Sequence, residues 1–126
     1  MSETIKYKYD IKEKSIEFSI CLIKYLNKIE KQRTTLAIVD QLVRSGTSIG
    51  ANIHEAQTSQ SNKEMMRYYR IALKSANESH YWFLLLDSIL ENDPEKSNLK
   101  SELNNLRNIL GKTLIRLKEK ENSIKK

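Results

Sequence analysis

The chain has 126 residues, of which 30% are charged, with three glycines and one proline, a composition typical of a single, nearly all-helical domain spanning residues 1–126. Its only cysteine, Cys21, excludes an internal disulfide and is expected to lie reduced in the core, which favours a cytoplasmic location. No stretch approaches the roughly 18 uncharged apolar residues of a membrane span, and the polar N-terminus lacks the apolar segment of a signal peptide. We therefore expect no membrane partner.

Four amphipathic helices are predicted, because apolar residues recur every three or four positions along most of the chain. The predicted helices cover about residues 10–31, 35–58, 62–91 and 94–121. The second is expected to take Thr34 or Thr35 as its N-cap, and Ser61 and Asp93 are expected to cap the third and fourth. Since the links are short, consecutive helices should be antiparallel. The fold class is thus all-α, an up-down-up-down antiparallel four-helix bundle.

The segment 41–56 of the second helix combines small residues with a few polar ones. Glycine costs a helix about 1 kcal/mol relative to alanine, so Gly46 and Gly50 indicate that another backbone approaches closely. Arg44, Asn52 and Glu55 share one helix face. They form either an exposed face with weak pairing or a hydrogen-bonded network buried between helices or subunits, and we favour the network.

The third helix carries a second apolar register beside its core stripe, which makes its apolar surface wider than one bundle core needs. One interpretation is that these residues fill the sides of the same core. The other, which we prefer, is a self-association surface with aromatic anchors. The residues expected at this oligomer interface are Tyr68, Ile71, Trp82 and Leu85.

The formal net charge is +6, and the excess falls on the first and fourth helices, whereas residues 61–91 balance four basic against four acidic side chains. Because the first and fourth helices are neighbours in an antiparallel bundle, their basic rows are expected to form one surface suited to phosphate backbones. The candidate residues are Lys24, Lys28, Lys31, Arg107, Lys112, Arg116 and Lys120. The alternative is ordinary solubilising charge, since +6 is common for small domains.

Catalytic and metal-binding patterns are absent from the sequence. A di-iron bundle requires Glu-x-x-His pairs, but Thr58 follows Glu55 and Tyr81 follows Glu78 at that spacing. No serine or cysteine has the partners of an activated nucleophile. We therefore predict no catalytic residue, no metal and no cofactor, and the chain is not expected to be an enzyme.

Two segments resemble the bacterial 23S ribosomal RNA intervening-sequence proteins, a family of four-helix bundles. The first segment reads R-S-x-x-S-I-x-x-N-I-x-E-A over residues 44–56, and the second reads I-A-L-x-x-A-x-E-x-x-Y-W over residues 71–82. The resemblance covers the second and third helices strongly and the other two by pattern and length. It adds Ser45 and Glu78 to Arg44, Asn52 and Glu55 as signature polar residues.

The resemblance implies a homopentamer with a positively charged surface or channel, and a similarity to the nucleic-acid-binding accessory protein of diversity-generating retroelements. It carries over no active-site residues. Two functions remain open at this point. The first is a non-enzymatic, oligomeric accessory protein that binds RNA or DNA through a basic surface without strong sequence preference. The second is an interaction scaffold that docks an acidic protein partner.

Overall fold

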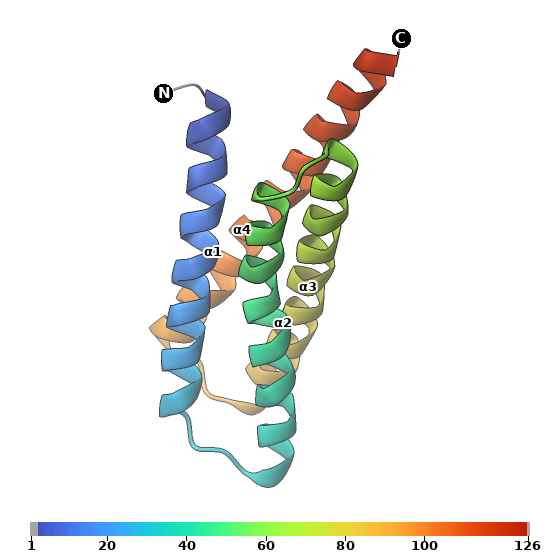
Figure 1. The fold of residues 1–126 in the computed structure, drawn as a ribbon. Coiled ribbons are helices and arrows are strands. Elements are labelled where there is room, and N and C mark those ends of the chain that lie inside the picture. The colour runs from blue at the N-terminus through green and yellow to red at the C-terminus, as the bar shows by residue number, and fades with distance from the viewer. Residues whose placement is uncertain (1–2, 126) are drawn as a thin grey trace.

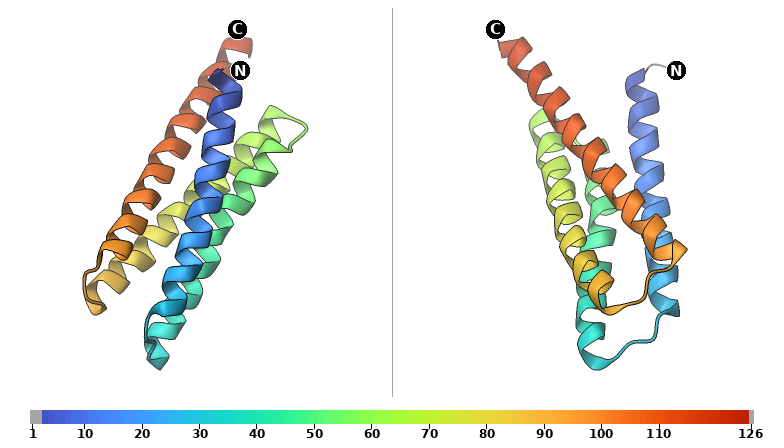
Figure 2. Two further views of the ribbon diagram at one scale, coloured as in Figure 1. Left: turned by 90° about the vertical axis from the view of Figure 1, so that its left-hand side faces the viewer. Right: turned by 180° about the vertical axis from the view of Figure 1, so that it is seen from behind.

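Four long antiparallel helices pack side by side in the computed structural model, which describes the backbone of residues 3–125 and the side chains of residues 11–124 (Figure 1). The helices are α1 (Glu3–Lys28), α2 (Arg33–Gln57), α3 (Asn62–Ile89) and α4 (Pro94–Lys125). The start of α1 and the end of α4 lie at the same end of the bundle, as expected for an up-down-up-down order (Figure 2). Around the described bundle, each helix backbone approaches only its two neighbours, α1 against α2 and α4, and α3 against α2 and α4. The predicted all-α four-helix fold is confirmed.

The helix ends differ from the prediction in a few places. Helix α1 begins earlier than predicted, at Glu3, and α4 continues to Lys125, because no glycine or proline interrupts the chain in these two extensions. At its other end α1 is shorter than predicted and stops at Lys28. The expected caps of α3 and α4 are confirmed: Ser61 Oγ accepts a hydrogen bond from the Glu64 amide at 3.2 Å, and Asp93 Oδ1 accepts one from the Lys96 amide at 2.8 Å.

The predicted N-cap of α2 is wrong. The capping position is Gln32, whose side chain makes no capping hydrogen bond, so Thr34 and Thr35 already lie inside the first turn of the helix. The core location expected for Cys21 is also wrong, because this residue is exposed on α1 while its neighbour Leu22 is fully buried.

The predicted apolar stripes form one continuous core along the bundle axis. Its members are buried side chains from all four helices and include Phe18, Leu22, Leu42, Ile49, Ile53, Tyr69, Phe83, Leu86, Leu99, Leu103, Leu106 and Leu110. Leu36 is an exception and is 46% exposed, because it points about 140° away from Ile49 around the axis of α2. In the first turns of α3, Met66 is buried, whereas its neighbour Met65 is half-buried.

Helix α1 packs closely on α2 at the two glycines. A Cβ atom at Gly46 would overlap Leu22 Cδ2 and lie 3.6 Å from Phe18 Cε1. A Cβ atom at Gly50 would lie 3.3 Å from the Ser15 hydroxyl oxygen and 3.5 Å from its carbonyl oxygen. The predicted close approach is confirmed at Gly50 for a backbone, whereas at Gly46 the approaching group is a leucine side chain.

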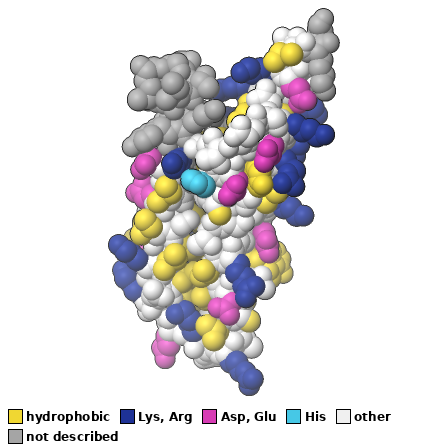
Figure 3. All heavy atoms as spheres, viewed as in Figure 1, with side chains coloured by type: hydrophobic (Ala, Val, Ile, Leu, Met, Phe, Trp, Pro, Cys, Tyr) yellow, Lys and Arg dark blue, Asp and Glu magenta, His cyan; other side chains and the backbone are white. Residues whose placement is uncertain are grey.

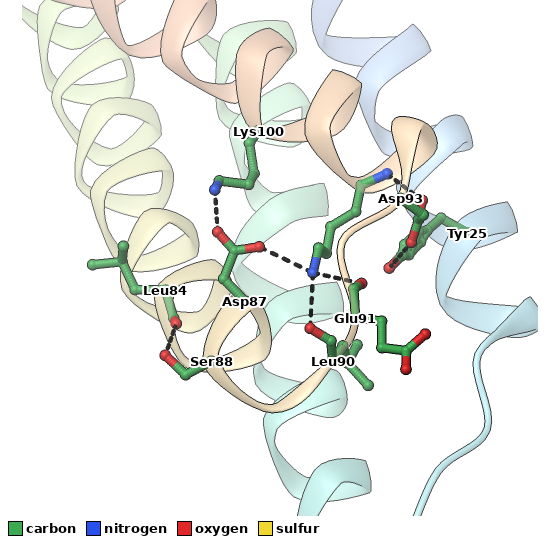
Figure 4. Close-up of polar contacts among 9 residues, drawn as sticks. Tyr25, Leu84, Asp87, Ser88, Leu90, Glu91, Asp93 and Lys100 are labelled. Carbon is green, nitrogen blue, oxygen red and sulfur yellow. Dashed lines mark hydrogen bonds and ion pairs between the residues drawn. The ribbon is translucent and has the colours of Figure 1, made fainter.

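The buried side chain of Lys96 holds the turn between α3 and α4. Figure 4 shows this turn, with the Lys96 partners Asp87, Leu90 and Glu91 labelled. Lys96 is 1% exposed, and its Nζ donates to the Leu90 and Glu91 carbonyl oxygens at 3.2 and 2.9 Å, so the ammonium group stabilises the C-terminal end of α3. The same ammonium lies 3.1 Å from Asp87 Oδ1, while Lys100 pairs with the other carboxylate oxygen. The hydrogen bond from Lys100 is the main cause that holds the pKa of Asp87 below its usual value. These contacts fix how far α4 is shifted along α3.

Two glycine variants test the close approach of α1. Gly111→Ala should raise the free energy of unfolding by about 1 kcal/mol, because alanine is the better helix former and no described atom lies within 4 Å of the added methyl group. Gly46→Ala receives the same helical gain but overpacks Leu22, which costs about 1–3 kcal/mol. Urea unfolding should therefore place the two variants about 1–3 kcal/mol apart. Equal stabilities would show that the core yields at Leu22.

Two lysine variants test the buried ion pair. Lys96→Met should lower the free energy of unfolding by about 2–4 kcal/mol, because two carbonyl groups and part of the Asp87 charge lose a buried partner. Lys100→Met removes a partner of the same carboxylate from a side chain that is 40% exposed, and should cost less than about 1 kcal/mol. Both are measured by urea unfolding at one protein concentration. Similar losses in the two variants would contradict the role assigned to Lys96.

Candidate nucleic-acid interface

Serine pairs join α2 to α3 along their seam, where these two helices make the most extensive helix–helix contact of the described bundle. Ser79 Oγ donates to Ser45 Oγ at 2.8 Å, and Ser75 Oγ donates to Ser48 Oγ at 3.0 Å. The Asn52 side-chain amide also donates to Ser48 Oγ at 2.9 Å. A polar network therefore exists between these helices, and it contains two of the signature residues, Ser45 and Asn52.

The charged signature residues lie outside this network. Arg44 and Glu55 are exposed, and Glu78 is exposed and accepts a hydrogen bond from Trp82 Nε1 at 3.4 Å. Within the protomer Arg44 and Glu55 therefore take no part in the network, and a network of these charges between subunits stays a prediction. Both charges lie within about 40° of Ser48 around the axis of α2, so they flank the outer edge of the seam.

Of the four residues expected at an oligomer interface, Tyr68, Ile71 and Trp82 lie toward the same outer edge, on the α3 side, whereas Leu85 stands in line with Arg67, five helical turns further along. Tyr68, Ile71, Trp82 and Leu85 are all half-buried, and Tyr68 and Trp82 pack in part against the protomer's own core. The remaining exposed area of the three residues at the outer edge forms a strip beside Arg44 and Glu55. Whether this strip contacts a second copy stays a prediction.

The basic rows expected on α1 and α4 do not meet in the protomer. Lys28 pairs with Glu95 at 3.1 Å, which places the C-terminal end of α1 beside the first turn of α4. Lys112 lies 17 residues beyond Glu95, or about 25 Å further along the axis. Lys31 is half-buried in the loop after α1, so it does not continue the helical face of Lys24. The antiparallel arrangement therefore separates the two rows.

A basic row on α3 was missed in the sequence. Lys63, Arg67, Arg70 and Lys74 are all exposed and fall within a sector of about 60° around the helix, in a line about 16 Å long. Figure 3 shows Lys and Arg side chains gathered along the edge of the molecule beside the upper part of α3. The net charge of residues 61–91 is zero and does not reveal the four cations of this row. Three of the four acidic residues that balance them follow position 77, beyond the row. The sequence signal that could have predicted the row is the spacing of four, three and four residues between successive cations, which places them on one helix face.

Arg107 extends this row from α4. Its Nε donates to Asn77 Oδ1 at 2.9 Å and a terminal nitrogen donates to Asn104 Oδ1 at 3.1 Å, which holds the guanidinium beside α3. We name the row Lys63, Arg67, Arg70 and Lys74, together with Arg107, the α3 basic face. Burial first, and then the Arg107 and Lys100 charges, hold the pKa of the nearby His80 below its usual value.

The other basic residues of α4 point elsewhere. Lys112, Arg116 and Lys120 are exposed and lie about 140–220° from Arg107 around the helix axis. They were expected to share one surface with Arg107, but Arg107 lies beside α3, where it donates to Asn77.

No other feature of the described residues suggests chemistry. They contain no group of three or more His, Cys, Asp or Glu side chains placed to hold a metal ion. An open hollow at the loop end of the bundle is lined by residues of both turns and by Tyr25, whose hydroxyl donates to Asp93 Oδ2 at 3.2 Å. None of the helices, searched over the part of the chain that the structure describes, is long and apolar enough to cross a membrane.

Comparisons with known proteins agree with the four-helix fold. The chain matches the family model described as 23S rRNA-intervening sequence protein over residues 7–112, and no curated protein matches it. A similar fold, with a TM-score of 0.77, occurs in the 1.70 Å crystal structure of a protein of unknown function from the S23 ribosomal protein family of Bacteroides thetaiotaomicron VPI-5482. That protein is 30% identical in sequence, and the match covers 86% of this chain and 97% of the other. The family match extends from α1 into the middle of α4, and the chain belongs to the 23S rRNA-intervening sequence protein family.

Proposed function

We propose that this protein is a non-enzymatic, oligomeric accessory protein that binds RNA or DNA through the α3 basic face, without strong sequence preference. The observation that carries the proposal is the line of four exposed cations on α3, which Arg107 of α4 extends. Such a line suits the phosphate backbone, which is bound by charge and carries no sequence information directly.

The chemistry of the α3 basic face fits phosphate groups. Arg67 and Arg70 offer planar donor forks that match phosphate oxygens, and Lys63 and Lys74 add mobile point charges at the two ends. The Arg67 guanidinium lies 4.9 Å from the centre of the Tyr68 ring, which restricts the side chain before any ligand binds. Lys24, Lys28, Lys31, Lys112, Arg116 and Lys120 are proposed as supplementary contacts, because they lie on other faces of the protomer.

We further propose that the protein assembles as a homopentamer in the cytoplasm, with the number five taken from the family resemblance. Support for a ring comes from two different apolar surfaces. Ile16, Ile20 and Ile23 on α1 are 42–48% exposed, and the strip that contains Tyr68 and Trp82 lies on the outer edge of the α2–α3 seam. When two different patches join head to tail, the assembly closes into a ring if the rotation permits. A ring would repeat the α3 basic face and strengthen its field.

Charge reversal on two surfaces tests the proposal. The variant Lys63→Glu/Arg70→Glu/Lys74→Glu should lose at least about 100-fold in affinity for a labelled RNA. For each phosphate contact that is lost, the salt dependence should weaken by about 0.7–0.9 in slope. The variant Lys24→Glu/Lys112→Glu/Lys120→Glu removes the same net charge from other faces, so it should lose much less. Affinity is measured by fluorescence anisotropy across a salt series, with oligomer mass checked for each variant.

The comparison of the two variants decides which surface binds. Equal losses of affinity would indicate that the rows of α1 and α4 contribute as much as the α3 basic face, or that binding depends only on the net charge. If the intact wild-type oligomer binds no nucleic acid at low salt, the proposal fails. A protein partner recovered after nuclease treatment would then favour the scaffold that docks an acidic protein.

A further inference from the structure

The exposed side of α3 continues beyond the cations to an aromatic ring. Tyr81 lies 18 residues after Lys63, which is five full helical turns, so the two side chains stand in line about 27 Å apart. Tyr81 is 52% exposed, and Asn77, the Arg107 partner, stands between it and Lys74. One face of α3 thus presents cations first and a flat aromatic surface at its end.

The Tyr81 ring packs against a neighbouring ring and still remains exposed to solvent. It meets the Trp82 ring edge to face, with 4.9 Å between the ring centres and 73° between the planes, and Glu78 accepts the hydrogen bond of the Trp82 indole. This contact restricts the tyrosine side chain, so less conformational entropy is lost when a planar group stacks on it. The exposed area remains large enough for such a group.

Two acidic residues border this line. Glu64 lines the same surface hollow as Lys63, Arg67 and Arg70, and Glu78 lies about 40° from Lys74 around the helix axis. Arg107 brings a fifth cation to the space between Lys74 and Tyr81, where Asn77 Oδ1 holds it. Cations therefore outnumber carboxylates by five to two along the line to the ring.

We infer that the α3 face binds single-stranded nucleic acid, with phosphates along the α3 basic face and a base stacked on Tyr81. Proteins that bind single strands without sequence preference combine a cationic track with aromatic rings on which bases stack. A duplex hides the faces of its bases inside the stack, so a base can stack on this exposed ring only if it is unpaired. This inference rests on the proposed function and adds the type of nucleic acid.

Substitution of Tyr81 tests the inference apart from the charges. Tyr81→Ala in the full-length oligomer should weaken binding of single-stranded RNA and DNA homopolymers by about 5- to 140-fold, the equivalent of about 1–3 kcal/mol per stacked base. The salt slope should not change, because no phosphate contact is removed. Tyr81→Phe keeps the ring and should keep the affinity. Leu84→Ala, which shortens another exposed apolar side chain of α3, is the matched control and should bind as the wild type does.

A second readout comes from Trp82, the only tryptophan of the chain. Because its ring touches Tyr81, its fluorescence should change when a single strand binds and should change less when a duplex of the same sequence binds. Circular dichroism and oligomer mass confirm that each variant folds and assembles.

The possible results distinguish a failure of this inference from a failure of the proposed function. Single-strand affinity that is unchanged in Tyr81→Ala, or duplex binding as tight as single-strand binding, overturns the inference. The proposed function survives that result if the charge reversals on α3 still abolish binding. The absence of any binding by the wild-type oligomer overturns both.

Discussion

The small side chains of α2 are the constraint on which the arrangement of the bundle depends. Gly46 and Gly50 admit α1 on one side, and Ser45 and Ser48 hold α3 by hydrogen bonds to Ser79 and Ser75 on the other. Because a paired hydroxyl in the seam is costly to separate from its partner, these bonds set the rotation of α3 about its own axis. With Ser75 and Ser79 turned toward α2, the side chains of the opposite face are turned about 80–180° away, toward solvent: Lys63, Arg67, Arg70, Lys74 and Tyr81.

Rotation alone does not place Arg107, which belongs to α4. The buried Lys96 ammonium fixes the shift of α4 along α3 by joining Asp87 and the two carbonyl groups just after α3 to the first turn of α4. Three helical turns further on, this register brings Arg107 level with Asn77. The α3 basic face thus depends on two separate structural devices, a polar seam that sets rotation and a buried ion pair that sets register.

The helices, the core stripes and two of the caps were predictable from the sequence, because each follows from local periodicity or from a residue beside its own helix. The separation of the Lys24 and Lys112 rows was not predicted, because it depends on where along the axis each residue falls once the helices are antiparallel. The α3 row was missed for a different reason: net charge was summed over a segment, whereas the helix sorts charges by angle. The serine pairs were missed because a small residue carries the same sequence signal whether it packs or donates a hydrogen bond.

The measurement that tests the central claim most directly is the salt dependence of single-strand binding by the wild-type oligomer. If five cations of one α3 basic face neutralise phosphates, the logarithm of the binding constant should fall linearly with the logarithm of salt concentration, with a slope of about −3 to −4 or steeper. Binding by an intact oligomer with a slope near zero, or no binding at low salt, would contradict the claim that this face is built for a phosphate backbone.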